Sequence, residues 1–229
     1  MKPIRLLLTT ALITVITAGA YAQNTFFPTR AGTVLLYANN NANGRAESHS
    51  RQTIKNVEGS GNNMTISYVY ESLDKNKNPL KPPTEIPCTV IIKDGTVNLD
   101  MSQMVAGQLQ GQQLKAEITG VPMELPSNLQ PGQTLKDAEV TLTIDMGVMK
   151  MITVIKMTDG KCLAIEDLTV PAGTFNCRKI TQTVTTTVLG RNITTTTVSW
   201  YALGIGTVKT ESYDNKNKLQ NSTVLVEIK

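Results

Sequence analysis

Three cysteines and one histidine are the side chains of this sequence that most readily perform chemistry. Cys88, Cys162 and Cys177 form an odd set, and their spacing contains no Cys-x-x-Cys pair of the kind that holds zinc. His49 is the single imidazole, and a cysteine or serine nucleophile needs such a base beside it. Nothing in the sequence places His49 next to a cysteine. We therefore predict a solvated surface histidine and no catalytic residues.

The cysteines also bear on the redox state of the protein. In an oxidising compartment, three cysteines allow one disulfide and one free thiol, with three pairings to choose from. We favour Cys162 with Cys177 as the candidate disulfide. The alternative is a reduced, buried trio that includes Cys88, because a free cysteine packs as a small apolar side chain.

Two further spacings resemble binding motifs. The segment Asp74–Asn78, with Glu85 further on, matches ligand positions of a calcium loop, but Pro79 stands where such a loop needs glycine. Gly204-Ile205-Gly206 begins like a phosphate-binding loop, but the residues after it alternate as a strand instead of forming a helix. We therefore predict a hairpin turn at the first site, a bend between two strands at the second, and neither metal nor cofactor.

The methionine-rich middle third supplies candidate residues for an apolar pocket, because methionine is flexible enough to line an adaptable cavity. The strand expected from Met149 to Met157 is apolar on both faces, and a neighbouring helix with an apolar stripe is expected to cover the second face. The predicted pocket lining is Met101, Met104, Val105, Leu109, Met149, Met151 and Ile155. A closely packed core without a cavity is the alternative.

The elements that would position these residues are mostly strands, because period-two alternation broken by short polar turns dominates the sequence. Asp94-Gly95 between two β-branched runs indicates a hairpin with a type I′ turn. Residues 101–109 change to the period of one short helix. The proline-rich segment 121–135 is expected to cross from one part of the sheet to another, or else to link two half-domains. The predicted fold class is all-β, mainly antiparallel: a curved sheet, sandwich or open half-barrel with one short helix.

The first 22 residues have the features of a signal peptide. Lys2 and Arg5 precede an apolar run of about 13 residues, shorter than the roughly 20 that span a bilayer, and Ala20-Tyr21-Ala22 is a small-x-small cleavage site. Cleavage after Ala22 would lower the formal charge from +4 to +2 by removing Lys2 and Arg5. We expect a mature single domain, 23–229, that is periplasmic or secreted and has no transmembrane segment. The scattered charge gives no indication of nucleic-acid binding.

Two segments of the C-terminal half are distinctive together: "EDLTVPAGTFNCRKI" (Glu166–Ile180) and "WYALGIGTVKTESYDNKNKL" (Trp200–Leu219), supported by "LPSNLQPGQTL" (Leu125–Leu135). On these residues the sequence resembles the DUF3108-like proteins, also labelled the TapB family, exported from Bacteroidetes-type bacteria. The likeness spans most of the mature chain, and it departs in the last turn, where Asn-Lys-Asn-Lys replaces the usual glycine. The resemblance implies an exported β-rich domain and no catalytic residues to carry over.

These observations favour a non-enzymatic binding or envelope-assembly module, whose partner is an envelope protein or an apolar ligand. A carrier of an apolar, lipid-like ligand is one alternative. A hydrolase whose catalytic set is not apparent from spacing is another. Converging titratable side chains in one pocket would favour the enzyme, whereas an apolar cavity or an uncovered strand edge would favour binding.

Overall fold

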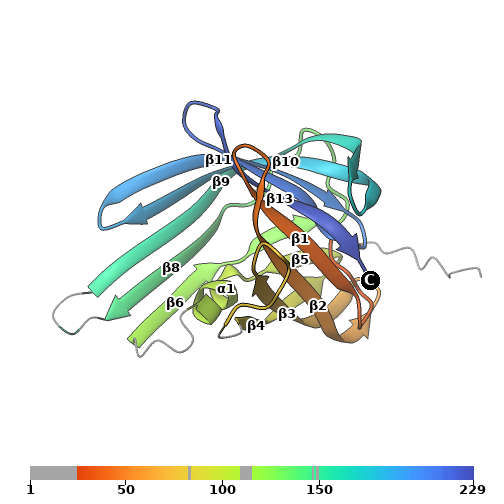
Figure 1. Cartoon of the computed structure of the whole chain (residues 1–229), viewed down its shortest axis with the longest axis horizontal. Helices are drawn as coiled ribbons and strands as arrows, with labels where there is room; N and C mark the ends of the chain where they lie inside the picture. Colours follow the sequence, from red (N-terminus) through yellow and green to blue (C-terminus); the bar gives the residue numbers. More distant parts are fainter. Residues whose placement is uncertain (1–24, 82–83, 109–114, 146, 148–149) are drawn as a thin grey trace, which may run out of the picture.

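The computed structural model describes residues 25–81, 84–108, 115–145, 147 and 150–229. They form one sheet of antiparallel strands and one short helix, as the sequence predicted (Figure 1). In chain order the elements are β1 (Val34–Asn41), β2 (Ala46–Ser60), β3 (Asn63–Leu73), β4 (Glu85–Lys93), β5 (Thr96–Leu99), α1 (Met101–Gln108), β6 (Lys115–Val121), β7 (Met123–Pro126), β8 (Ala138–Asp145), β9 (Lys150–Val170), β10 (Gly173–Val188), β11 (Arg191–Ala202), β12 (Gly206–Tyr213) and β13 (Leu219–Ile228).

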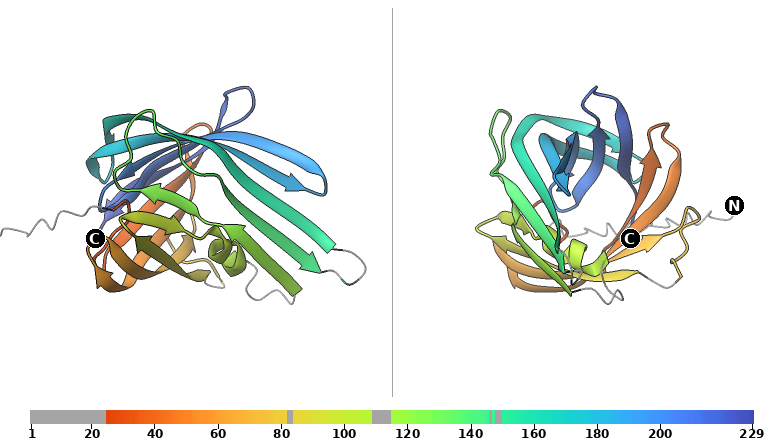
Figure 2. Two further views of the ribbon diagram at one scale, coloured as in Figure 1. Left: turned by 180° about the vertical axis from the view of Figure 1, so that it is seen from behind. Right: turned by 90° about the vertical axis from the view of Figure 1, so that its left-hand side faces the viewer.

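The sheet curls into a nearly closed barrel (Figure 2). Its strand order is β6-β8-β9-β10-β11-β12-β13-β1-β2-β3-β4-β5-β7. The two end strands, β6 and β7, follow each other in the chain with Pro122 alone between them. Because β6 pairs with β8 and β7 pairs with β5, the chain passes from one end of the sheet directly to the other. Along β6, the edge away from β8 pairs with no strand of the described chain.

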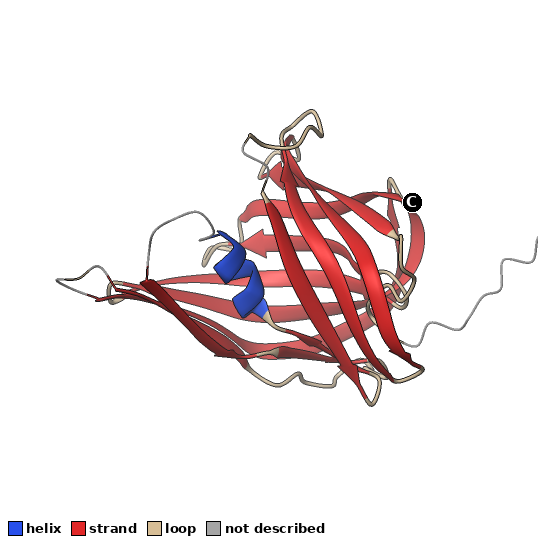
Figure 3. Cartoon of the chain, turned by 90° about the horizontal axis from the view of Figure 1, so that it is seen from below, coloured by secondary structure: helices blue, strands red, loops and turns tan. Residues whose placement is uncertain are grey.

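The helix α1 lies at the mouth between the two parts of the curved sheet, where it packs against β4, β6 and β8 (Figure 3). Asp100 caps its start by accepting a hydrogen bond from the backbone N–H of Ser102 at 2.9 Å. The side-chain amide of Gln103 accepts from the N–H of Thr89 at 2.6 Å and donates to its carbonyl at 3.4 Å. Since β5 ends at Leu99, Gln103 takes the place of a strand residue beside β4.

Local sequence explains the individual strands. In β4, the apolar residues alternate with exposed ones, so that Ile86, Cys88, Val90 and Ile92 are buried on one face. The hairpin from β4 to β5 turns at Asp94-Gly95, where both residues have a positive φ (50° and 76°). That backbone is a type I′ turn, as predicted.

The proline-rich segment after β7 is the predicted crossover, since it leads from one end of the strand order to β8 near the other. It runs beside β9, where the N–H of Gly132 donates to the carbonyl of Cys162 and the N–H of Cys162 donates to Gln133. Leu129 and Leu135 bury their side chains in the main core cluster. The segment therefore belongs to the barrel and does not link two half-domains.

Candidate functional site

The glycine motif before β12 anchors the N-terminal segment inside the barrel. Gly204 and Gly206 have positive φ values of 74° and 89° in the turn from β11 to β12. The N–H of Gly204 donates to the carbonyl of Thr25 at 2.7 Å. A Cβ on Gly206 would lie 3.3 Å from the carbonyl oxygen of Phe26. The predicted bend between strands is confirmed, and it holds Phe26 and Phe27 in place.

A cavity of about 400 Å³ lies next to these two phenylalanines. Its lining comes from strands on both sides of the barrel and from α1. The aromatic lining residues are Phe26, Phe27, Tyr37, Tyr68, Tyr70 and Tyr201. The other apolar ones are Leu99, Met101, Met104, Ile205 and Gly206, and the polar ones are Asn39, Ser50, Gln52, Thr207, Thr210 and Thr223.

The cavity gathers most of the aromatic residues of the chain. The sequence contains three Phe, six Tyr and one Trp, of which Tyr21 lies outside the described residues. Six of the remaining nine line this one cavity. Aromatic side chains are large and dominate the energetics of burial, so their concentration here marks the cavity as the best candidate for a ligand site.

The aromatic walls are fixed by ring packing and by a hydrogen bond. Phe27 packs against Tyr68 with ring centroids 5.4 Å apart, and Phe26 meets Tyr201 edge-on at 6.5 Å. The hydroxyl of Tyr37 donates to the carbonyl of Thr207 at 3.1 Å. Burial raises the pKa of Tyr37, Tyr68 and Tyr201 above the usual 10. The three hydroxyls are therefore neutral hydrogen-bonding groups at physiological pH.

The structure brings only part of the predicted pocket together. Met101 and Met104 of α1 line the cavity, and the thiol of Cys88 approaches the sulfur of Met104 at 3.6 Å. The remaining predicted positions do not form a pocket with them. Val105, Met151 and Ile155 are half-buried outside the cavity lining, and Leu109 and Met149 lie outside the described residues.

The prediction that α1 covers one face of β9 is wrong. We expected α1 to cover a second apolar face of this strand, but Ile152 is 49% exposed. The helix packs mainly against β4 and β6 instead. The aromatic residues that do line the cavity were missed, although one signal was visible: Tyr68 and Tyr70 share a face of β3, and aromatic residues are scarce elsewhere.

The predicted disulfide between Cys162 and Cys177 is not formed, and all three cysteines are free and buried. The strands β9 and β10 are neighbours, but Cys162 is opposite Ile180, whereas Cys177 is opposite Glu166. The two thiols pack in different core clusters. Burial raises the pKa of each, that of Cys177 to about 11, where the carboxylates of Asp167 and Glu166 contribute. They are therefore poor nucleophiles at neutral pH.

His49 is buried, which corrects the expectation of a surface histidine. The turn Asp74–Asn78 packs beside it, and the carbonyl of Asp74 lies 3.3 Å from its Nδ1. The carboxylate of Asp74 accepts from the N–H groups of Asn76 and Asn78, both at 2.8 Å, and from the Asn78 side chain. The carboxylate is thus used to close a turn, as predicted for this segment.

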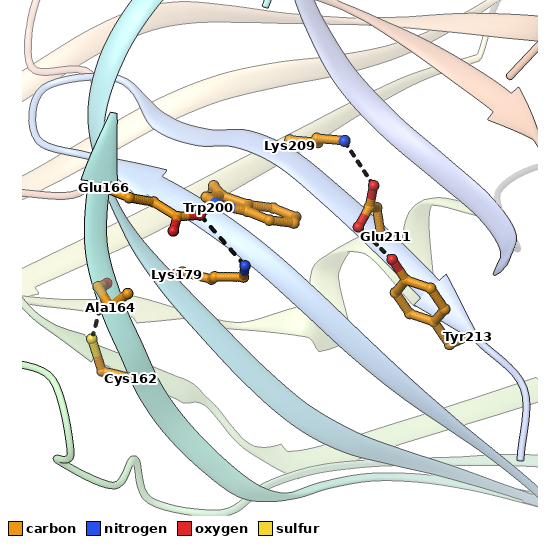
Figure 4. A network of polar contacts seen from close by, with 8 residues as sticks. All are labelled: Cys162, Ala164, Glu166, Lys179, Trp200, Lys209, Glu211 and Tyr213. Carbon is orange, nitrogen blue, oxygen red and sulfur yellow. Dashed lines mark hydrogen bonds and ion pairs between the residues drawn. The ribbon is translucent and has the colours of Figure 1, made fainter. Parts of the chain in front are cut away.

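A second polar cluster surrounds Trp200 (Figure 4). Lys179 and Lys209 are its cross-strand neighbours, with ammonium nitrogens 5.1 and 5.3 Å from the ring centroid. The indole N–H donates to Glu166 at 2.7 Å, and Lys179 lies 3.5 Å from the same oxygen. The hydrogen bond from Trp200 lowers the pKa of Glu166, and Lys179 adds to the effect.

The same network includes Glu211, which contacts Lys209 at 2.7 Å and accepts from the hydroxyl of Tyr213 at 2.6 Å. Burial alone would raise the pKa of Glu211, but these two partners outweigh it and the pKa lies below its usual 4.5. Both carboxylates are therefore ionised and paired. This arrangement stabilises the sheet and leaves neither group in the protonation state of a general acid.

The cavity offers a ligand apolar contact and neutral hydrogen-bonding groups. Within the described residues, its lining contains no Asp, Glu, His, Lys or Arg. The described part of the chain also has no group of three His, Cys, Asp or Glu side chains that could hold a metal ion. Among the helices described, none is long and apolar enough to cross a bilayer.

Comparison with known proteins identifies the family and the fold. The model of the family described as DUF3108-like matches residues 30–225. A predicted exported protein with a YmcC-like fold from Bacteroides fragilis is 21% identical, with a TM-score of 0.73 over 90% of this chain and 99% of that one. A predicted lipoprotein from Parabacteroides distasonis is 24% identical, with a TM-score of 0.73 over 90% and 98%. No curated protein sequence matches the chain.

Proposed function

This chain belongs to the DUF3108-like family, and we propose that it is an envelope protein that binds an apolar or amphipathic small molecule inside its barrel. The observation that carries the proposal is the cavity of about 400 Å³ with its six aromatic residues. That volume falls in the range of roughly 300–1,000 Å³ typical of small-molecule sites. A mainly apolar lining with a few polar groups on one side is the usual composition of such sites.

A location in the envelope is supported from two directions. The first 22 residues have the charge pattern, apolar run and cleavage site of a signal peptide. Two proteins of the same fold are described as an exported protein and a lipoprotein. A molecule with an apolar surface is poorly soluble in the aqueous part of an envelope, and a barrel interior would shield it from water.

Binding is favoured over hydrolysis by the state of the reactive groups. Burial of the three cysteine thiols raises their pKa, that of Cys177 to about 11, so little of the nucleophilic thiolate forms at neutral pH. The Nδ1 of His49 contacts the backbone carbonyl of Asp74. Glu166 and Glu211 are held as ion pairs with lysines. None of these groups lines the cavity.

The experiment is a titration of the mature chain with N-phenyl-1-naphthylamine, a neutral dye that fluoresces in apolar surroundings. Thr210→Phe places a ring in the cavity and should weaken dye binding by about tenfold or more, equivalent to about 1.4 kcal/mol. Thr65→Phe puts the same side chain on an exposed position of β3 and is the matched control. Thermal melts establish that both variants are folded.

Native mass spectrometry of protein purified from its own host provides an independent readout, namely a co-purifying small molecule that Thr210→Phe lacks. Equal dye binding by wild type and both variants would place the dye elsewhere and contradict the proposal. So would a wild-type protein that binds no dye and carries no small molecule.

A further inference from the structure

Uncharged polar side chains form one continuous row across the inside of the sheet. Each member is the direct cross-strand partner of the next, from β11 through β12, β13 and β1 to β2. The members of this polar row are Ser199, Thr210, Thr223, Asn39 and Ser48. Its three central members, Thr210, Thr223 and Asn39, line the cavity.

Side-chain hydrogen bonds hold the row in place. The hydroxyls of Ser199 and Thr210 are 2.9 Å apart. Thr223 donates to the side-chain oxygen of Asn39 at 3.1 Å, and the amide nitrogen of Asn39 donates to Ser48 at 3.2 Å. The groups are therefore positioned in advance, and hydroxyl and amide groups retain capacity for a further bond to a ligand.

The row lies at one end of the cavity and the phenylalanines lie at the other. Gly206, at the start of β12, touches Phe26, and Thr210 of the row is four residues further along the same strand. At about 3.3 Å per strand residue, the two ends are roughly 13 Å apart. The phenylalanines thus lie at the end of the cavity opposite the row, where Thr207 and Gln52 also belong to the lining.

Charged groups near the cavity stay outside its lining. Arg178 stacks over the Phe26 ring with its guanidinium carbon 5.7 Å from the centroid. Asp100 caps α1 through Ser102. A charged ligand group at the polar row would lose water without gaining an opposite charge, which disfavours charged head groups.

One polar group beside the cavity lacks a partner. The side-chain nitrogen of Gln52 is buried and makes no hydrogen bond within the described residues. Gln52 also lines the cavity. Gln52 is opposite Tyr70 of β3 and is four residues along β2 from Ser48, so this donor lies toward the aromatic end of the cavity and is not part of the polar row.

We propose that the ligand is a single-chain amphiphile with an uncharged, oxygen-bearing head group, the head lying at the polar row and the chain against Phe26, Phe27 and Met104. The volume of about 400 Å³ is near the low end for ligand sites and suits one chain better than two. This assignment rests on the proposed function, because it specifies what that cavity binds.

The test compares three ligands with the same ten-carbon chain and different heads: decanol, decanoate and decylammonium. Each is titrated against N-phenyl-1-naphthylamine bound to the mature chain at pH 7.5, with decanol kept below its solubility limit and the two ions below their micellar concentrations. Decanol should compete at concentrations at least about tenfold lower than either ion, because neither charge finds a partner at the row. Equal or tighter binding of an ion would overturn the neutral head group while leaving the binding function intact. Failure of all three ligands to displace a bound dye would overturn the amphiphile as well. A dye that never binds would instead count against the proposed function itself.

Two near-isosteric variants test where the head lies. Asn39→Asp adds a negative charge to the row, and its carboxylate can still accept from Thr223 and Ser48. It should strengthen decylammonium binding by about tenfold and weaken decanoate binding. Thr223→Val removes one hydroxyl and should weaken decanol binding severalfold, whereas Thr65→Val on the exposed face of β3 should leave it unchanged. Unchanged head-group preference in both row variants would overturn the placement of the head.

Discussion

At the scale of single residues, burial decides which groups can react. The thiols of Cys88, Cys162 and Cys177 are buried, and each donates a weak hydrogen bond to a nearby carbonyl of its own strand. Burial disfavours the thiolate, which is the nucleophilic form, and raises the pKa of all three thiols. The consequence is a protein whose cysteines are inert while it is folded.

That consequence predicts the outcome of alkylation. Iodoacetamide at pH 8 should add no label to the native protein during a period in which protein unfolded in urea, without reductant, gains three. Intact mass distinguishes the two states. Rapid labelling of the folded protein would show an accessible thiolate, and uptake of a single label after unfolding would show a disulfide.

The carboxylate of Glu211 predicts a dependence of stability on pH. Its pKa is below 4.5 in the folded state, so the folded protein holds its proton less tightly than the unfolded chain does. Its contribution is therefore complete above about pH 4.5 and is lost as the pH falls through the folded pKa. The urea midpoint of Glu211→Gln should lie below that of wild type at pH 7, and the gap should shrink by pH 3. Glu117→Gln on exposed β6 is the matched control; a gap of constant size would contradict the ion-pair account.

At the scale of elements, two hairpins of the sheet differ in how well their turn residues suit a left-handed backbone. Asp94-Gly95 is a favourable type I′ pair, whereas the hairpin from β10 to β11 turns at Leu189-Gly190. Leu189 has a φ of 49° and is 65% exposed. A branched apolar residue in the left-handed region is strained, and its side chain gains little from packing at this site.

Leu189→Asn should therefore stabilise the protein by about 1 kcal/mol, since asparagine tolerates the left-handed backbone. Urea unfolding followed by tryptophan fluorescence measures the change. Leu189→Ala removes the same apolar side chain without relieving the backbone, and it separates the two causes. If asparagine is no more stabilising than alanine, backbone strain is not what limits this hairpin.

The secondary-structure elements are also the feature of this protein that its sequence predicts best. Alternation indicated the strands, Asp94-Gly95 the tight turn, and residues 101–109 the helix, because each depends on neighbours in the chain. The cavity depends on distant partners instead: Thr223 bonds to Asn39 across 184 positions, and Tyr37 to Thr207 across 170. A strand's period gives its two faces but not the strands beside it. For that reason the methionines of α1 were found and the aromatic wall was not.

At the scale of the whole molecule, one residue joins the two ends of the sheet. The strands β6 and β7 belong to opposite ends of the order, and Pro122 alone separates them in the chain. The first and last strands, by contrast, lie within the order: β1 pairs with β13, and the backbones of Val34 and Lys229 exchange two hydrogen bonds. Strands that are consecutive in the chain, β6 and β7, are therefore unpaired, whereas the first and last strands, β1 and β13, are paired.

This arrangement makes the protein suited to circular permutation. A short Gly/Ser linker from Lys229 to the segment before β1, with new termini opened at Pro122, would keep every strand pair and cut only the link between β6 and β7. Such a permutant should fold with the same β-type circular dichroism but bind N-phenyl-1-naphthylamine more weakly, because the shortest of the three chain connections between the two ends of the sheet is lost. Undiminished dye binding would show that the connections through α1 and residues 127–137 hold the two edges in place without the link at Pro122. The chain passes between the two ends of the sheet three times in succession, through α1, at Pro122 and through residues 127–137, so the permutant measures what the shortest of these passages adds to ligand retention.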